Sequence, residues 1–208
     1  GSFLREVMVA DGVDATAMVT VAGAPTTLAF VHLAPDGERS FSFVRSPGAD
    51  TKLCAGDVPH SLIAKAAALH VGSLSFTHEE SSQAAWHALD VAAYANVTIS
   101  CDVNLRPLLW DDLARARDAI KTLLARCQFA KLSLEELNFV LNDALDIGPL
   151  SRARRLVALF PNVGLLALTM GAEGSLVLAR EESGLLQIIE VPGVIVDVVD
   201  TTGAGDTY

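Results

Sequence analysis

Hydrophobic and polar positions along the chain follow two periods, one typical of strands and one typical of helices. The first part, after a helix expected over residues 3–10, carries short runs rich in β-branched and aromatic residues. These runs predict strands over residues 17–21, 26–33 and 39–44. Residues 39–43 alternate in period two, which places Phe41 and Phe43 on one face. Such strands either pack into a core or form an antiparallel flap over a substrate, and the pattern alone favours the core.

After Ser46 the pattern changes to alternating strands and helices. Strands are predicted over residues 69–72, 97–102, 129–132, 163–169, 175–178, 185–191 and 194–199. Helices are predicted over residues 57–67, 79–94, 111–126, 133–141 and 150–160. This alternation is typical of an α/β domain with a mostly parallel central sheet and helices on both faces, a three-layer α/β/α arrangement. Ligands of such sheets bind at the carboxyl ends of the strands.

Composition narrows the class of protein. The chain has 208 residues, of which 51% are hydrophobic, so it can form one large domain and is not expected to be disordered. Its apolar runs are too short to span a bilayer, so no membrane association is expected. The net charge of −10 argues against a nucleic-acid partner. An anionic nucleotide would therefore need local groups and a metal to hold it.

The cysteines and histidines do not suggest a metal or disulfide framework. Cys54, Cys101 and Cys127 are widely spaced and form no Cys-x-x-Cys pair. They are expected to be buried free thiols of a reducing, cytoplasmic compartment. The five histidines lack the spacing of metal ligands.

The heptapeptide Asp-Thr-Thr-Gly-Ala-Gly-Asp at residues 200–206 follows the apolar run 194–199, which predicts a buried strand. Its small residues allow a sharp turn with exposed backbone N–H groups, and a helix starting there would add its dipole to an anion site. Asp206 would lie beside the anion, where a general base is useful, and Asp200 could hold a cation. The combination indicates phosphoryl transfer to an alcohol. The alternative is a glycine-rich turn without chemistry.

Polar residues follow the predicted strands. Asp102, Asn104 and Arg106 occupy alternate positions after the strand 97–102 and could face sugar hydroxyls and a phosphate together. The alternative is a capped loop in which Arg106 pairs with Asp102. Ser133 and Glu136 have the spacing of a capping box, although the Glu136 carboxylate could instead hold Mg²⁺ through water.

Glycines follow the predicted strand 163–169. Gly171 and Gly174 come two and five residues after Thr169, which allows close approach by a ligand. A turn between antiparallel strands needs the same glycines. The sequence leaves both interpretations open.

Together these stretches resemble the ribokinase-like (PfkB-type) carbohydrate kinases. Residues 200–206 match the second signature of that family, and the segment 47–50, the Asp-x-Asn-x-Arg run, Glu136 and Thr169-x-Gly171 occur in the family order. The phenylalanine-rich hairpin and the run 102–110 look most like fructokinases, while similar runs occur in 2-keto-3-deoxygluconate kinases. Ser133 stands where the family's Asn-x-x-Glu motif has asparagine.

The resemblance implies a role for each matching position. The anion hole would be formed by Gly203, Ala204 and Gly205, with Asp206 as the catalytic base. The nucleotide phosphates would lie beside Thr169, Gly171, Gly174, Gly203 and Gly205. Mg²⁺ would be associated with Glu136, and a monovalent cation such as K⁺ with Asp200 and Thr202. The sugar would be faced by Asp102, Asn104, Arg106, Phe43 and Arg45.

The resemblance also implies the reaction. Residues 1–208 would be a ribokinase-like domain, incomplete at both ends, in which about 16–45 contributes the strands of a β lid. It would transfer the γ-phosphoryl group of ATP to a primary hydroxyl of a monosaccharide, most like fructose to fructose 6-phosphate, with Mg²⁺ and K⁺, as a homodimer. Alternatives are a 2-keto-3-deoxygluconate kinase, another sugar or nucleoside kinase of the family, and a non-catalytic kinase-like protein. A dinucleotide-dependent oxidoreductase is excluded because no Gly-x-Gly-x-x-Gly follows a strand.

Overall fold

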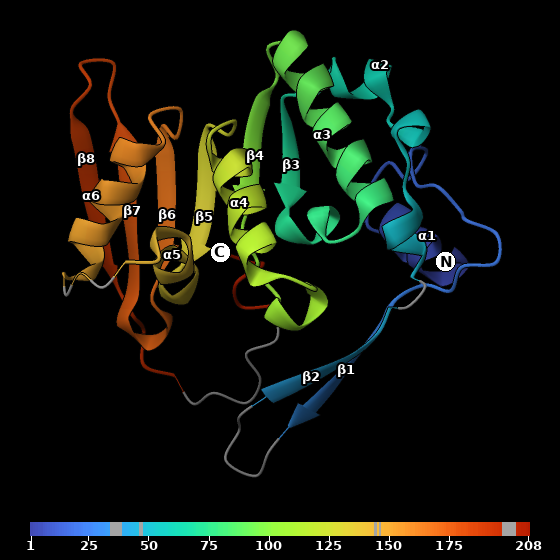
Figure 1. The fold of residues 1–208 in the computed structure, drawn as a ribbon, viewed down its shortest axis with the longest axis horizontal. Helices are drawn as coiled ribbons and strands as arrows, with labels where there is room; N and C mark the ends of the chain where they lie inside the picture. Colours follow the sequence, from blue (N-terminus) through green and yellow to red (C-terminus); the bar gives the residue numbers. More distant parts are fainter. Residues whose placement is uncertain (34–38, 46–47, 144, 146, 197–202) are drawn as a thin grey trace.

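A six-stranded sheet forms the centre of the molecule (Figure 1). The computed structural model describes residues 1–33, 39–45, 48–143, 145, 147–196 and 203–208. The strands lie side by side in chain order: β3 (Ala68–Gly72), β4 (Thr98–Asp102), β5 (Phe129–Ser133), β6 (Leu165–Thr169), β7 (Gly174–Arg180) and β8 (Leu186–Pro192). β3 to β6 are parallel, whereas β7 and β8 pair in antiparallel fashion. The prediction of a mostly parallel sheet is confirmed.

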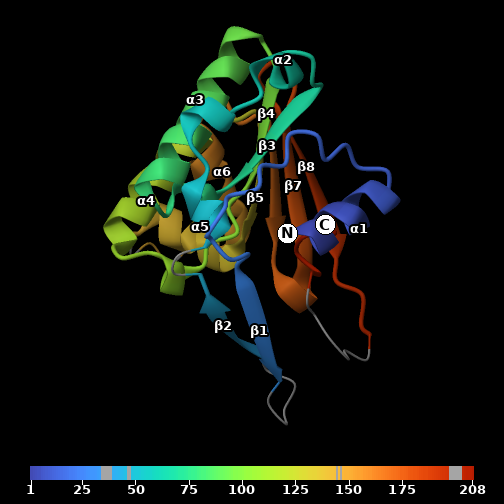
Figure 2. The same ribbon diagram turned by 90° about the vertical axis from the view of Figure 1, so that its right-hand side faces the viewer.

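Helices follow the parallel strands because a parallel connection must cross from one end of the sheet to the other. The long helices are α3 (Glu79–Tyr94), α4 (Leu113–Leu124), α5 (Leu134–Leu141) and α6 (Pro149–Leu159). Figure 2 shows these four on one face of the sheet and α1 (Ser2–Ala10) on the other side. The prediction of layered α/β/α architecture is confirmed.

Side-chain alternation along the central strands decides which face carries the core. Ile99, Ala130, Leu132, Leu166 and Leu168 are each at most 2% exposed, and all belong to the core shared with the helices. The residues between them point to the opposite face, since successive strand residues alternate. The polar residues at the strand ends lie in this second set. They are therefore placed on the face away from the four long helices.

The hairpin of β1 (Leu28–Leu33) and β2 (Arg39–Val44), here called the lid, extends away from the sheet (Figure 1). Leu28, Phe30 and Val44 are about half exposed, at 52%, 50% and 54%. The interpretation that these strands pack into the core is therefore wrong. They form a separate antiparallel sheet.

The strand expected over residues 17–21 does not form, and these residues pair with no strand. The Arg5 guanidinium donates to the carbonyl oxygen of Ala15 at 2.7 Å and to that of Met18. Carbonyls used in this way do not need a strand partner. The helix expected over residues 57–67 is also shorter: η2 (Ala55–Asp57) precedes Pro59, and α2 covers only His60–Ile63.

The final strand was predicted wrongly over the part that the structure describes. Residues 194–196 have no strand structure, and Val194, Ile195 and Val196 are 82%, 101% and 64% exposed. A strand needs a partner for its backbone groups, and apolar pattern alone does not supply one. Residues 197–199 lie outside the described residues.

The cysteines differ in their surroundings. The Sγ atoms of Cys101 and Cys127 lie 3.5 Å apart in the core, whereas Cys54 is exposed, which contradicts the expectation of burial for that residue. The hydrogen bond with Cys127, together with burial, raises the pKa of the Cys101 thiol. All three are free thiols. No helix in the described ranges is long and apolar enough to cross a membrane.

Candidate active site

A cavity of about 530 Å³ opens at the carboxyl ends of the parallel strands β4, β5 and β6. Its lining includes six residues that the sequence singled out: Asp102, Asn104, Arg106, Glu136, Thr169 and Gly205. These positions are spread over a hundred residues of sequence. The parallel sheet brings them together, as expected for a site at this edge.

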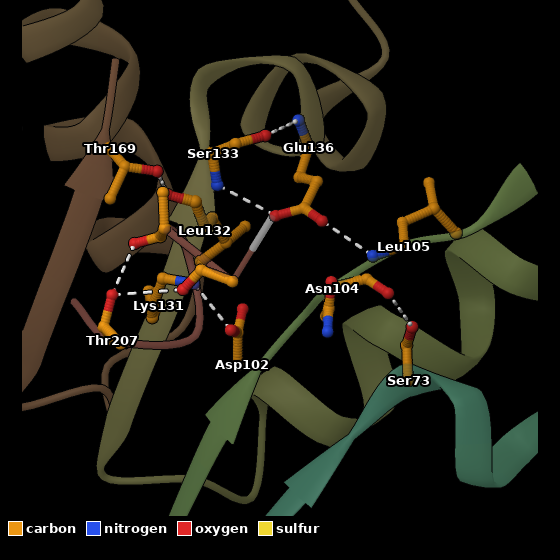
Figure 3. A network of polar contacts seen from close by, with 12 residues as sticks. Ser73, Asp102, Asn104, Leu105, Lys131, Leu132, Ser133, Glu136, Thr169 and Thr207 are labelled. Carbon is orange, nitrogen blue, oxygen red and sulfur yellow. Dashed lines mark hydrogen bonds and ion pairs between the residues drawn. The ribbon is translucent and has the colours of Figure 1, made fainter. Parts of the chain in front are cut away.

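An ion pair between Asp102 and Lys131 lies in the cavity (Figure 3). Asp102 ends β4, and the strand register sets it directly opposite Lys131 of β5, on the same face. The Lys131 Nζ atom lies 2.6 Å from Asp102 Oδ2, and the two side chains are 20% and 14% exposed. Lys131, and not Arg106, is therefore the partner of Asp102. The Nη1 atom of Arg106 donates to the carbonyl of Leu105 instead.

The segment after β4 is fixed by backbone contacts on both sides. The Val103 N–H donates to the Lys131 carbonyl at 3.0 Å, which extends the pairing of β4 with β5. Asn104 has a left-handed backbone with φ of 42°, a conformation that asparagine tolerates better than most residues. The Ser73 hydroxyl lies 3.5 Å from the Asn104 carbonyl oxygen. This turn directs residues 104–106 along the cavity instead of onward as a strand.

Glu136 joins this segment to the start of α5. The Ser133 hydroxyl accepts from the Glu136 N–H at 3.2 Å, and Glu136 Oε2 accepts from the Ser133 N–H at 2.8 Å, so the predicted capping box is confirmed. Oε1 accepts from the Leu105 N–H at 2.6 Å. Burial raises the pKa of Glu136; the two backbone N–H groups oppose this and the Asp102 charge adds to it.

The raised pKa of Glu136 leads to a testable pH dependence. The folded state holds this proton more tightly than the unfolded chain, so the contribution to stability is greatest below the ordinary glutamate range and is lost as pH rises through the raised pKa. Glu136→Gln removes the titrating carboxyl group. It also lowers the stability by an amount that does not depend on pH, because an amide cannot accept both N–H groups. The free energy of unfolding of wild type minus that of E136Q, measured by urea denaturation, is expected to fall as pH rises from the ordinary glutamate range through the raised pKa of Glu136. A difference that rises over this range would contradict the assignment.

The end of the chain forms a turn beside Lys131. The Thr207 N–H donates to the Gly203 carbonyl at 3.0 Å, a bond of helical spacing, and Gly203 has φ of 76°. The Tyr208 hydroxyl hydrogen-bonds to Ser175 of β7, which anchors the turn near the ends of β6 and β7. A Cβ atom placed on Gly205 would lie 3.5 Å from Lys131 Nζ. The ammonium group therefore lies between Asp102 and the turn (Figure 3).

Other predicted residues lie elsewhere. Gly171 lies in the connection between the antiparallel strands β6 and β7, and Gly174 begins β7; neither is among the residues that line the cavity. A Cβ atom on Gly174 would lie 2.0 Å from the Val191 carbonyl oxygen, so backbone packing by itself requires glycine there. Phe43 and Arg45 line a separate hollow of about 420 Å³ between the lid and residues near Asp111. Asp200 and Thr202, predicted to hold a monovalent cation, lie outside the described residues.

Sequence reasoning missed Lys131. The signal was a lysine between apolar neighbours in the strand 129–132, at a position that alternates away from the core residues. Its importance depends on the neighbour across the strand, which the sequence does not give. Only the register identifies Asp102 as that neighbour.

The carboxylates of the site suit a divalent ion that is held partly by protein groups and partly by a bound substrate. Among the described residues no group of three or more His, Cys, Asp and Glu side chains is arranged to hold a metal. Mg²⁺ commonly uses one or two carboxylates, waters and substrate phosphates instead of an all-protein site. Glu136 faces the cavity and has a carboxylate whose oxygens retain acceptor capacity beyond the two N–H bonds. The donor set fits that mode of binding.

The fold and the site define an α/β protein with a cationic group and an exposed glycine turn at the carboxyl edge of a parallel sheet, the edge at which such sheets bind their ligands. Comparison with known proteins identifies the family. The model of the pfkB family carbohydrate kinases matches residues 1–208, and the chain belongs to this family.

Curated relatives and solved structures agree with this family assignment. Fructokinase-1 of Zea mays is 36% identical over 209 residues, covering all of this chain and 62% of that protein. The fructokinase of Vibrio cholerae O395, solved with fructose, ADP and calcium ion, is 26% identical with a TM-score of 0.82, covering 99% of this chain and 63% of that one. A PfkB protein from Polaromonas sp. JS666 is 27% identical with a TM-score of 0.81, covering 99% and 65%. This chain thus spans less than two thirds of the length of these relatives, and its fold is ribokinase-like.

Proposed function

We propose that the protein is an ATP-dependent sugar kinase that transfers the γ-phosphoryl group to a primary hydroxyl of a monosaccharide, with fructose as the first candidate. The observation that carries the proposal is the arrangement of Lys131, Asp102 and Gly205 around one cavity at the strand ends. A turn with exposed amides and a nearby ammonium suits phosphate oxygens. The Asp-x-Asn-x-Arg segment in the same cavity suits sugar hydroxyls. The similarity to fructokinases supports fructose.

Asp206 is the proposed base. An aspartate has an ordinary pKa of about 3.9 and is a weak base for an alcohol. Phosphoryl transfer tolerates this, because its transition state is loose and most of the catalysis comes from positioning and charge stabilisation. Asp206 would orient the sugar hydroxyl and accept its proton late in the transfer.

The turn and Lys131 would stabilise the charge of the moving phosphoryl group. Gly203, Ala204 and Gly205 leave their amides free of bulky side chains, and the ammonium of Lys131 lies beside Gly205. Such preorganised donors act strongly in a site shielded from water. Thr169, at the cavity wall, would contact the nucleotide phosphates. The family resemblance implies that Gly171 and Gly174, which do not line the cavity, lie near these phosphates.

Two cations complete the proposal. Mg²⁺ would be associated with Glu136 and with the phosphates of ATP, and when bound it would neutralise phosphate charge. Asp200 and Thr202 would hold K⁺. A double-mutant form of the Vibrio cholerae fructokinase was solved with fructose, ADP and potassium ion, which supports potassium as the monovalent cation.

A second substrate remains a candidate because of Arg106. Arg106 lines the cavity, and the hydrogen bond that its guanidinium donates to Leu105 uses one of its five N–H groups. A guanidinium pairs with a carboxylate in bidentate fashion, which suits an acidic sugar such as 2-keto-3-deoxygluconate. Phe43 on the lid would cover either sugar and exclude water.

The test is ADP release by the full-length enzyme with ATP, Mg²⁺ and a panel of fructose, ribose, 2-keto-3-deoxygluconate and adenosine. Turnover with fructose would support the proposal as stated. Turnover with another panel member would retain the reaction and change the substrate. ATP binding without turnover on any member would refute the kinase and favour a non-catalytic, kinase-like protein.

The homodimer stays a prediction. Leu28, Phe30, Val31 and Val44 expose apolar side chains on the lid, and a second copy of the chain could cover them. Light scattering of the purified protein is expected to give twice the mass of the chain. A monomeric mass at micromolar concentration would contradict this prediction.

A further inference from the structure

The lid has little of its own to fix its orientation. It extends away from the sheet, and its apolar side chains are half exposed (Figure 1). A two-stranded hairpin is marginally stable by itself. The contacts at its base join the lid to the body of the protein.

The base of β2 is held by one buried guanidinium. Arg45, 8% exposed, follows directly after β2. Its Nη1 donates to the Thr77 hydroxyl at 2.8 Å and its Nη2 to the Leu74 carbonyl at 3.2 Å. Both acceptors belong to the segment of η3 (Ser73–Phe76) and its C-cap. The guanidinium thus ties the lid to the body of the protein.

Asp50 joins the two strands of the lid at the same point. Its Oδ2 lies 2.7 Å from Arg45 Nε and 2.6 Å from Arg45 Nη2, and its Oδ1 accepts from the hydroxyl of Thr27, just before β1. Burial opposes ionisation of Asp50, but the hydrogen bonds from Thr27 and Arg45 and the Arg45 charge outweigh it, so the pKa is lowered. One carboxylate therefore connects both strands to the guanidinium.

The space around this contact is filled. A Cβ atom on Gly48 would lie 2.5 Å from the Thr27 hydroxyl oxygen, 2.7 Å from Asp50 Oδ1 and 3.0 Å from Arg45 Cγ. At such distances a side chain at residue 48 would force its neighbours to shift. The group of Thr27, Arg45, Gly48, Asp50 and Thr77, here called the joint, is packed closely enough to hold one orientation.

The joint is connected to the sugar-facing segment. The same η3 that accepts from Arg45 begins with Ser73, whose N–H donates to the Val103 carbonyl at 3.3 Å and whose hydroxyl lies 3.5 Å from the Asn104 carbonyl. Arg45 and Asn104 are therefore attached to one short element. A change at the joint would alter the lid and this segment together.

We infer that Arg45 is a positioning residue, which through Asp50, Thr77 and Leu74 holds the lid in register with the segment 102–106. This inference rests on the proposed function. It differs from the role implied by the family resemblance, in which Arg45 faces the sugar. Nε, Nη1 and Nη2 of Arg45 all donate to protein acceptors, which leaves the guanidinium little capacity for a sugar.

The test compares Arg45→Met, Asp50→Asn and Thr77→Val in the full-length enzyme, with Arg115→Met as a control. Arg115 is half exposed and its nearest carboxylate lies 4.0 Å away. For each variant, KM for the sugar, KM for ATP, kcat and the ratio of ADP to sugar phosphate are measured. Hydrogen exchange of the β1 and β2 amides adds a readout that does not depend on activity.

Each of the three joint variants is expected to raise KM for the sugar about 10-fold, to leave KM for ATP within about twofold and to release ADP in excess of sugar phosphate, because water enters beneath a misplaced lid. Amide exchange in the lid is expected to accelerate. R115M is expected to match wild type.

Three outcomes would overturn the inference: unchanged KM and coupling, unchanged exchange in the lid, or a defect in R45M alone, which would mark a direct sugar ligand. If R45M does not fold, D50N and T77V carry the test. An inactive wild type would refute the proposed function instead, and the exchange measurement would still test the joint.

Discussion

Asp206→Asn is expected to lower kcat by about 10³-fold or more while leaving ATP affinity nearly unchanged. General base catalysis contributes about 10² to 10⁴-fold, and asparagine keeps the size of the side chain but cannot accept the sugar proton. Because Asp206 is exposed in the turn, the substitution is not expected to change stability. The measurements are steady-state ADP release with the preferred sugar and calorimetric titration with ATP and Mg²⁺.

Asp118→Asn is the matched control for this change. Asp118 is exposed on α4, remote in sequence from the turn, and the same chemical substitution there is expected to leave kcat at the wild-type value. Near-normal turnover by D206N would remove Asp206 from the role of base. A loss of ATP binding in D206N would mean that the turn, and not the proton transfer, had been damaged.

Lys131→Met is expected to lower kcat by about 10²-fold, the usual effect of removing one donor that stabilises transition-state charge. Methionine keeps the apolar length of the side chain and removes the ammonium that lies 2.6 Å from Asp102 and beside Gly205. Asp102, whose side chain is 14% exposed, would then lack its partner, which is expected to destabilise the fold by about 1–3 kcal/mol. Kinetics and urea denaturation separate the two effects.

A double-mutant cycle distinguishes a structural from a catalytic role of Lys131. If the lysine serves only to neutralise Asp102, the variant that combines Asp102→Asn with Lys131→Met should match Asp102→Asn alone in both stability and turnover. We expect the two to match in stability only, because the phosphoryl group would still lack the ammonium. Lys65→Met, an exposed site, is the control. Turnover of the double variant equal to that of D102N would contradict contact between Lys131 and the phosphoryl group.

Local pattern predicted most of the sheet and its helices. Period-two and period-3.6 spacing placed β2 and α3 at their observed bounds, and β4, β5 and β6 within one or two residues. The capping box at Ser133 and Glu136 was also predicted, because it depends on residues three apart in sequence. Features set by neighbours along the chain are readable from the sequence.

Pattern failed where a distant side chain replaced the expected partner. The apolar run 17–21 did not become a strand; Arg5 binds the Met18 carbonyl within it and the Ala15 carbonyl just before it. Residues 194–196 have the composition of a strand but no partner along the described chain. Strand propensity describes a side chain that fits a sheet, and it does not create the neighbouring strand.

The sequence by itself determined the fold class, the family and the order of the motifs around the cavity. Only the tertiary structure decided that Lys131 pairs with Asp102, because strand register sets which residues of two strands lie opposite each other. Only the tertiary structure shows that the Arg45 guanidinium is bonded at the joint, because its acceptors at Leu74 and Thr77 are about thirty residues away in sequence. The physical reason is the same in both: an ionised group inside a protein is directed by the nearest opposite charge or acceptor in space, and folding, not sequence distance, chooses that neighbour.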